Sequence, residues 1–325
     1  MQGQIGERAL FRSVYKHIRR HDKTGEPETI GHDYSVGSLP GIDHEMITAA
    51  AYAVDPAHAW HIAMNHFAMS GGICTGARIA LLLPEFSTEA DVKQTMQVLN
   101  ALADRDGVQL LAVDSLIVEH DEQPCCGVTA VGIREMGALS DVSHVKPGDE
   151  IVQVGYTGLL ATSQLYQTHR AEFESRFNRD FVADAIRKTE IFDVRPAVRH
   201  ALSCGADVYA LKNIGFGGVF GALWQLAAAA NCGVTADREQ MPILQETIEA
   251  AEYFQINPYE MRGDGSFLVI APDGEAVASH MREAGFETAV VGVLTDGKDR
   301  ILKDTNRFLT SVEEDGLYKV SGIQI

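Results

Sequence analysis

Short apolar runs and helical patterns alternate along the first half of the chain. Four of the apolar runs predict buried strands. These runs are 46–54, 77–83, 108–118 and 126–133. Two segments between them, 58–72 and 88–107, carry small and apolar residues at helical spacing. The order strand–helix–strand–helix–strand–strand predicts a sheet with helices on one face, and it leaves the other face free for a partner.

Capping residues indicate where these helices begin and end. The second helix opens on Thr88, with two acidic residues in its first turn, where the helix dipole favours negative charge. The first helix stops at Gly71-Gly72, because glycine is typical of helix C-termini. A further amphipathic helix over about 6–20 precedes a loop rich in glycine, proline and aspartate.

A turn at Pro147-Gly148-Asp149 marks the boundary with a second half. The 325 residues are many for one core, so two domains are expected, 1–145 and 146–325. Helix and strand alternate again in the second half, with glycine at the ends of the segments. The clearest strands are 151–156, 266–272 and 287–294, and the clearest helices are 216–233 and 271–285. The predicted fold class is α/β, with an α+β first domain.

Charge and composition restrict the classes of partner. The net charge of -18 repels DNA and RNA, so no nucleic acid is expected as a partner. The one basic run, 16–20, reads as the solvated face of the N-terminal helix. No apolar stretch reaches the length of a membrane span, and the N-terminus lacks the pattern of a signal peptide. Five scattered cysteines, never spaced C-x-x-C, favour reduced thiols in the cytoplasm.

Residues 215–274 resemble the C-terminal domain of the aminoimidazole ribonucleotide synthetase (AIR synthase) superfamily. Further segments fall in the order of that family along most of the chain. They are IGHDYSV, AVDP, HIAMNHFAMSGG, ARIALLLPE, KPGDEIVQVGYTGLLATS and VVGVLTDGKDRIL. The likeness is greatest to bacterial AIR-synthase-related proteins often labelled hydrogenase maturation factors.

This resemblance implies an AIR synthase-like two-domain fold. Members of the superfamily use ATP, usually with magnesium, bound in a cleft lined by the N-terminal domain. The cleft commonly lies at a dimer interface, where two N-terminal sheets close into one barrel. The resemblance therefore implies ATP, magnesium and a homodimer for this chain.

Several positions keep the family's residue types. Asp33 in IGHDYSV and Asp55 in AVDP match acidic family positions and are the candidates for a metal, if any is bound. The loop after Asp55 is several residues shorter than the family's. Asp264, in a tight Gly-Asp-Gly turn, is a weaker candidate for ligand contact, since a related turn lies near the substrate cleft in the family.

Two glycine pairs are candidates for binding an anion. Gly217-Gly218 open the helix of the second half, and backbone N–H groups at a helix start can bind an anion whatever the side chains are. Gly155 and Gly158 lie in a second turn between a strand and a helix. Both turns predict contact with a phosphate-bearing ligand.

Other positions depart from the family. Asn65-His66 stand where the family reads Asn-Asp, and imidazole is a poor magnesium ligand. Asn213 replaces the aspartate of a family Asp-x-Thr-x-Gly-Gly motif, with the cationic Lys212 beside it. Fewer carboxylates weaken magnesium binding and leave transition-state charge less neutralised. Conventional magnesium–ATP turnover is therefore expected to be weakened or absent.

A third motif has also changed. The segment 112–116, which contains Asp114 and Ser115, replaces a family Gly-Gly-His-Thr-Glu, so side chains stand where a backbone approaches phosphate. Asp114 compensates only in part for the lost carboxylates. The C-terminal cysteine that accepts a carbamoyl group in hydrogenase maturation factors has no counterpart after Cys232. That particular chemistry is not expected here.

The sequence leaves several interpretations open. The histidines at 58, 61 and 66 are read as satisfied helix residues, with a transition-metal site as the less favoured alternative. Lys212 and His66 form a cationic pair that replaces the metal, or else the site has drifted after losing its function. The protein binds a nucleotide or a phosphorylated small molecule, or it is a catalytically silent dimerisation or regulatory partner of an active relative.

Overall fold

The computed structural model describes residues 9, 12–14, 33–39, 41–119, 123–137, 139, 142, 144–320 and 322. The chain divides into two compact units. The described residues of the first unit lie within 33–137, and most of those of the second lie within 139–320. The helix predicted over about 6–20 falls largely outside the described residues.

A five-stranded sheet with two helices forms the first unit. Its elements are β1 (Ser35–Ser38), β2 (His44–Ala53), α2 (Pro56–Ala68), β3 (Ile73–Pro84), α3 (Glu89–Asp106), β4 (Gln109–Val118) and β5 (Cys125–Glu135). The strand order is β1-β2-β5-β3-β4, and all neighbours are antiparallel except the parallel pair β3 and β4. The four predicted strands and both helices are confirmed, and only β1 was missed.

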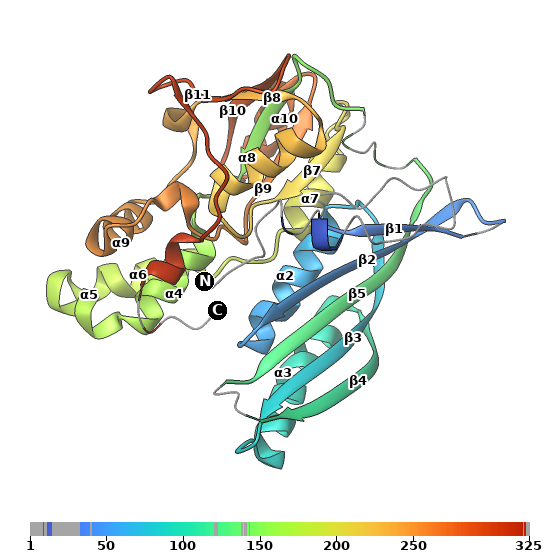
Figure 1. Cartoon of the computed structure of the whole chain (residues 1–325), viewed down its shortest axis with the longest axis vertical. Helices are drawn as coiled ribbons and strands as arrows, with labels where there is room; N and C mark the ends of the chain where they lie inside the picture. Colours follow the sequence, from blue (N-terminus) through green and yellow to red (C-terminus); the bar gives the residue numbers. More distant parts are fainter. Residues whose placement is uncertain are drawn as a thin grey trace. The chain divides into compact units, whose positions relative to one another are not determined.

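Both helices lie on the same face of this sheet (Figure 1). The side chains of β2 alternate accordingly: Ile47 is fully buried, whereas Met46 and Tyr52 are exposed on the opposite face. Asp91 and Thr88 form the capping box that begins α3, and Gly107 ends this helix with a left-handed backbone. The two ends of α3 therefore lie where the sequence predicted them.

The second face of the first sheet carries exposed apolar side chains. Tyr52 on β2 is 67% exposed, Leu116 on β4 is 61% exposed, and Ile133 on β5 and Leu82 on β3 are also exposed. Burial of such side chains against another surface would release roughly 25 cal/mol for each Å² removed from water. The open face expected from the order of elements is thus present in the structure.

Seven strands and several helices form the second unit. In chain order the elements are β6 (Glu150–Val154), α4 (Leu159–Thr168), α5 (Arg170–Arg176), α6 (Arg179–Thr189), α7 (Arg195–Leu202), β7 (Ala210–Asn213), α8 (Gly218–Ala229), β8 (Gly233–Ala236), η2 (Arg238–Gln240), α9 (Gln245–Phe254), η3 (Pro258–Glu260), β9 (Phe267–Ala271), α10 (Gly274–Glu283), β10 (Thr288–Thr295), β11 (Arg300–Leu302), β12 (Arg307–Phe308) and η4 (Gly316–Lys319). The strand order is β12-β11-β8-β10-β6-β9-β7. The five segments predicted most clearly correspond to β6, α8, β9, α10 and β10.

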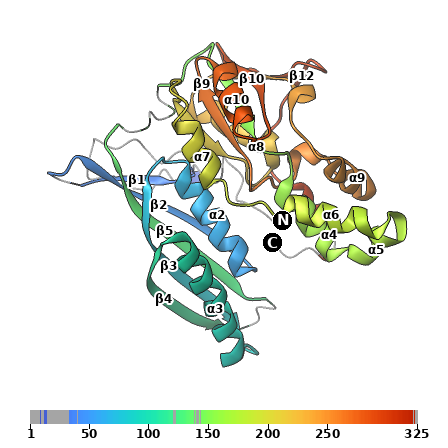
Figure 2. The same cartoon turned by 180° about the vertical axis from the view of Figure 1, so that it is seen from behind.

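Helices cover both faces of this second sheet. Figure 2 shows α7 and α10 in front of the sheet, with α8 on the side that faces the viewer in Figure 1. All five residues of β9 are buried, as expected for a strand enclosed on both sides. Helix α8 contributes Val219, Leu223 and Ala227 to the core, each fully buried. None of the helices described is both long and apolar enough to cross a bilayer.

Candidate functional site

Two turns in the second unit join a strand to the start of a helix through glycine. Gly155 and Gly158 connect β6 to α4, and Gly217 and Gly218 connect β7 to α8. All four have positive φ angles, between 63° and 85°, which glycine adopts without strain. A Cβ atom at Gly218 would lie 2.5 Å from the carbonyl oxygen of Tyr259. The local geometry predicted for both glycine pairs is therefore present.

A third turn, 261–266, links the first two. The N–H of Ala161 in α4 donates to the carbonyl of Arg262 at 3.1 Å, and that of Gly263 donates to the carbonyl of Gly215 at 3.4 Å. The hydroxyl of Ser266 donates to the carbonyl of Tyr156 at 2.6 Å. We call the three turns together, 155–158, 213–218 and 261–266, the glycine-turn site.

Asp264 lies at the centre of the glycine-turn site and is 1% exposed. The amide of Asn213 donates to its Oδ1 at 3.2 Å, and Nε of Arg262 donates to its Oδ2 at 3.1 Å. Desolvation by burial acts to lower the pKa of Arg262, but the neighbouring carboxylates outweigh it and raise this pKa. The guanidinium of Arg262 thus balances the negative charge of Asp264. Arg262 was not foreseen from the sequence, although the motif Arg-Gly-Asp-Gly places the two charges close together.

Asp315 is a second buried carboxylate at this site, and no motif in the sequence pointed to it. Its Oδ2 accepts the N–H of Gly217 at 2.8 Å. Its Oδ1 accepts the N–H of Leu317 at 3.0 Å and that of Arg262 at 3.3 Å. Burial raises the pKa of Asp315 from its ordinary value of 3.8 to about 6, although these N–H groups and Arg262 oppose the shift. The N–H of Gly217 expected to be available to an anion is therefore already bonded to a carboxylate.

Lys212 is the residue before Asn213 on β7, which is an edge strand of the second sheet. It is 8% exposed and pairs across the ladder with Leu268, while Asn213 pairs with Phe267. Successive residues of a strand point to opposite faces, so the Lys212 side chain leaves β7 on the face opposite to Asn213. The side chains of Lys212 and Asn213 therefore do not line the same pocket.

In the first unit, the candidate residues lie at separate places. Asp55 caps α2, where its carboxylate accepts the N–H groups of Ala57 at 2.7 Å and His58 at 3.4 Å. Asn65 and His66 lie in the last turns of the same helix, roughly 16 Å further along its axis at 1.5 Å per residue. Asn65 is fully buried. Asp55 and this pair are therefore at opposite ends of α2.

The other candidates of the first unit are on its sheet. Asp33 is half-buried and lies two residues before β1. Asp114 forms an ion pair with Arg78, and both side chains are about 60% exposed. Arg78 precedes the buried Ile79 on β3, so the ion pair lies on the open face of the sheet. Ser115 follows Asp114 and is also exposed. Asp114 is therefore a surface residue with a cationic partner.

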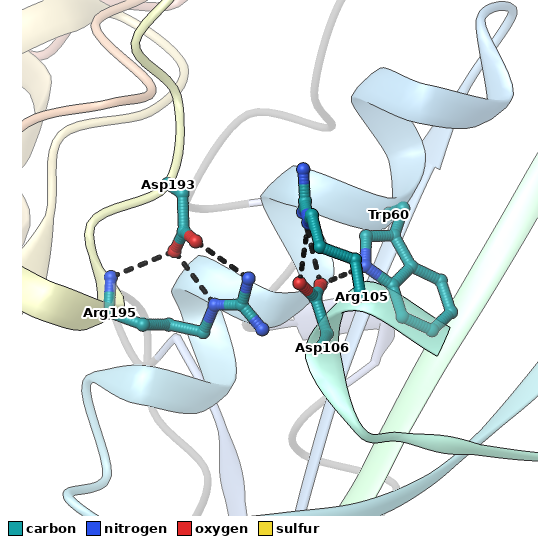
Figure 3. Close-up of polar contacts among 5 residues, drawn as sticks. All are labelled: Trp60, Arg105, Asp106, Asp193 and Arg195. Carbon is teal, nitrogen blue, oxygen red and sulfur yellow. Dashed lines mark hydrogen bonds and ion pairs between the residues drawn. The ribbon is translucent and has the colours of Figure 1, made fainter. Parts of the chain in front are cut away.

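Helix α2 is held to α3 by a buried indole. Nε1 of Trp60 donates to Oδ2 of Asp106 at 2.7 Å, and Arg105 donates to the same carboxylate (Figure 3). Figure 3 also shows Asp193, which accepts the backbone N–H and the guanidinium of Arg195 at the start of α7 in the second unit. Trp60 is fully buried, so the bond to Asp106 fixes the helix that carries Asp55 and Asn65.

The acidic residues described do not form a magnesium site by themselves. Magnesium requires several oxygen ligands in nearly octahedral geometry. Among the residues described, no group of three or more His, Cys, Asp or Glu side chains could hold a metal ion. Asp55, Asp114 and Asp264 each bind a group of the protein itself. The candidate residues, as they are arranged, do not fit this cation.

The second unit matches a known family. Residues 146–304 match the family described as AIR synthase related protein, C-terminal domain. Most of the second unit therefore matches an AIR synthase-related C-terminal domain. This confirms the resemblance found in the sequence. Across 307 residues the chain is 24% identical to the carbamoyl dehydratase HypE of Rhizobium leguminosarum bv. viciae, covering 88% of this chain and 81% of that protein.

Solved structures share the fold of this protein. E. coli HypE, a hydrogenase maturation protein, has a TM-score of 0.70 at 15% identity, covering 86% of this chain and 87% of the other. HypE in complex with ATP has a TM-score of 0.67 at 16% identity, covering 97% of both chains. AaThiL complexed with AMPPCP and TMP has a TM-score of 0.65 at 17% identity, covering 89% and 91%. The predicted AIR synthase-like two-domain fold is confirmed.

Proposed function

We propose that this AIR synthase-related protein binds a nucleotide or a phosphorylated small molecule, with conventional magnesium–ATP catalysis weakened or lost. Support for the ligand class comes from relatives: one HypE structure contains ATP, and one ThiL structure contains AMPPCP and TMP. The two glycine turns of the second unit have the backbone geometry that suits close approach of a phosphate.

The observation that supports weakened catalysis is the pairing of Asp264 with Arg262 and Asn213. A magnesium ion at this carboxylate would have to displace a buried cation and an amide. Transfer of a phosphoryl group depends on cations that neutralise the charge developing on its oxygens. Arg262 neutralises Asp264, and Asn213 stands in place of a carboxylate. The second unit therefore supplies few of the anionic oxygen ligands that magnesium needs.

Calorimetric titration of ATP, ADP and inorganic phosphate, each with magnesium and with EDTA, tests the proposal. Binding of ATP that is equal in magnesium and in EDTA, together with negligible ATP hydrolysis, is the expected result. Binding of ATP that requires magnesium would contradict the proposal.

An alternative function is that of a catalytically silent partner, as a homodimer or with an active relative. The open face of the first sheet favours it, because Tyr52 on β2, Leu82 on β3 and Leu116 on β4 are exposed there. Sedimentation equilibrium tests self-association, with Leu116→Asp as the disrupting variant. Phe308→Asp, at a position 68% exposed in the second unit, is the matched control. A monomer at all concentrations would contradict the homodimer, and absence of any nucleotide binding would favour the silent-partner function.

We also propose that the protein acts in the cytoplasm. The proposal rests on the odd number and scattered positions of its cysteines, which are typical of a reducing compartment.

A further inference from the structure

The C-terminal segment 312–320, which we call the C-terminal strap, covers the glycine-turn site of the second unit. Leu317 in the strap is fully buried, and the rings of Tyr318 and Phe216 lie 6.1 Å apart. A Cβ atom at Gly217 would lie 3.0 Å from Cβ of Val312, and one at Gly316 would lie 3.1 Å from Cγ of Met261. The strap therefore packs directly against two of the three turns.

A single carboxylate attaches the strap through hydrogen bonds. Within the part of the chain that the structure describes, the strap makes two hydrogen bonds to other segments, and Asp315 accepts both. The donors are the backbone N–H groups of Gly217 and Arg262. The remaining bonds of the strap are internal, from Leu317, Tyr318 and Val320 to residues of the strap itself. Loss of the Asp315 contact would leave the strap held by apolar packing alone.

Asp315 lies where an anion is expected in this turn. Gly217 caps α8, a helix of 12 residues, and its N–H points at the carboxylate as it would at a bound anion. The carboxylate is fully buried, and the groups that face it are the N–H and guanidinium of Arg262, the phenol of Tyr318 and the N–H groups of Gly217 and Leu317. The strap thus supplies an internal anion to the site.

Burial of the Asp315 carboxylate costs the folded protein free energy. An ionised carboxylate loses its hydration on burial, and three N–H bonds restore only part of that stabilisation. A phosphate group carries more charge and more acceptor oxygens than a carboxylate, and it can remain partly in water. Phosphate can therefore compete with Asp315 for hydrogen bonds from the same N–H groups.

We propose that the C-terminal strap is displaceable: a phosphate-type anion replaces the Asp315 carboxylate on the N–H groups of Gly217 and Arg262 and releases residues 312–320. The strap then regulates access to the glycine-turn site. This inference goes beyond nucleotide binding, because it requires only inorganic phosphate.

Hydrogen–deuterium exchange of the full-length protein tests the inference without a nucleotide. Sodium phosphate is titrated against sodium chloride at constant ionic strength and pH. We expect saturable faster exchange of the amides of Leu317, Tyr318 and Val320 with phosphate, while the amides within α8 keep their protection. Strap exchange that is unchanged by phosphate would overturn the proposal, whether or not ATP binds in a separate titration.

Asp315→Ala and its matched control Glu314→Ala, a change at the exposed neighbouring position, provide a second test. Asp315→Ala removes the internal competitor, so strap exchange should be fast without phosphate and the apparent affinity for phosphate should rise by about tenfold or more. Glu314→Ala should behave like the unmodified protein. A folded Asp315→Ala variant with slow strap exchange and unchanged phosphate affinity would contradict the proposal. If this variant fails to fold, the phosphate titration of the unmodified protein still decides.

Discussion

Asn213 and Asp264, 51 positions apart in the sequence, meet through a 3.2 Å hydrogen bond from Nδ2 to Oδ1 in the interior of the second unit. The bond joins the end of β7 to the turn before β9. Asp264 also accepts from Arg262, so an amide and a guanidinium share one carboxylate. Asn213 is neutral, and Arg262 supplies the positive charge beside Asp264.

Asn213→Asp should destabilise the protein when no divalent cation is present. The change replaces a buried donor with a second carboxylate next to Asp264, so a hydrogen bond is lost and two like charges oppose each other. We expect a loss of about 1–3 kcal/mol in the free energy of unfolding in EDTA, measured by chemical denaturation. Magnesium should restore part of the loss if the restored aspartate binds it.

The matched control for this variant is Asn178→Asp. Asn178 caps α6 with its side-chain oxygen, a role that aspartate fills equally well. Equal stability of both variants in EDTA would show that the Asn213–Asp264 contact has no energetic importance.

Asp106→Ala should destabilise the first unit. The indole N–H of fully buried Trp60 would lose its acceptor, and an unsatisfied buried donor costs about 1–3 kcal/mol. Denaturant unfolding followed by tryptophan fluorescence measures the effect. Asp104→Ala, on an exposed position of the same helix, should change stability by no more than about 0.5 kcal/mol. Equal effects of the two variants would contradict the proposed importance of this bond.

The stability contribution of Asp315 should decrease as the pH rises. Its folded-state pKa of about 6 lies above the ordinary 3.8, so between these values the folded protein binds more protons than the unfolded chain. The contribution is fully present below pH 3.8 and is lost as the pH rises through 6. Between pH 5 and pH 7.5 the loss amounts to about 1.4 kcal/mol.

The measurement compares the free energy of unfolding of the unmodified protein with that of Asp315→Ala at each pH. Taking the difference removes the pH dependence of other carboxylates, many of which act in the opposite direction. A difference that stays constant from pH 5 to pH 7.5 would contradict the assignment.

Gly218→Ala should destabilise the second unit more than Gly297→Ala. Both glycines have a left-handed backbone, with φ of 63° and 84°, so alanine is strained at either. At Gly218 the new Cβ would also approach the carbonyl oxygens of Tyr259 and Met261 to 2.5 and 2.6 Å, whereas at Gly297 it meets nothing within 4 Å. We expect a loss of about 1 kcal/mol at Gly297 and several times that at Gly218. Thermal unfolding measures both, and equal losses would show that the close approach does not matter.

The sequence predicted the elements whose signals are local. Helix α3 begins at Thr88 because a capping box forms within four residues, and the strands of the first sheet follow from continuous apolar runs. Both glycine turns were also predictable, since a left-handed backbone between a strand and a helix selects glycine at that position. Strand β1 was missed because its four residues, Ser35–Ser38, carry no apolar pattern.

The candidate site was predicted less well than the fold. Its backbone was foreseen through Gly158 and Gly217, and Asp264 was recognised as a weak candidate. Its charge balance was not. The motif Arg-Gly-Asp-Gly places Arg262 near Asp264 but does not show that both are buried, and Asp315 acts through a partner 98 positions away. Asp114 reads as a candidate ligand in the sequence, but its neighbour Arg78 comes from another strand, 36 positions earlier.

For this protein, the sequence by itself indicated the resemblance to the superfamily, the order of the clearest strands and helices and the positions of the glycine turns. The strands, helices and turns depend on residues close together in the chain. Only the tertiary structure decided which groups neutralise the buried carboxylates. Asp315 meets Gly217 from 98 positions away, and the energy of a buried charge depends on the neighbours that folding brings to it.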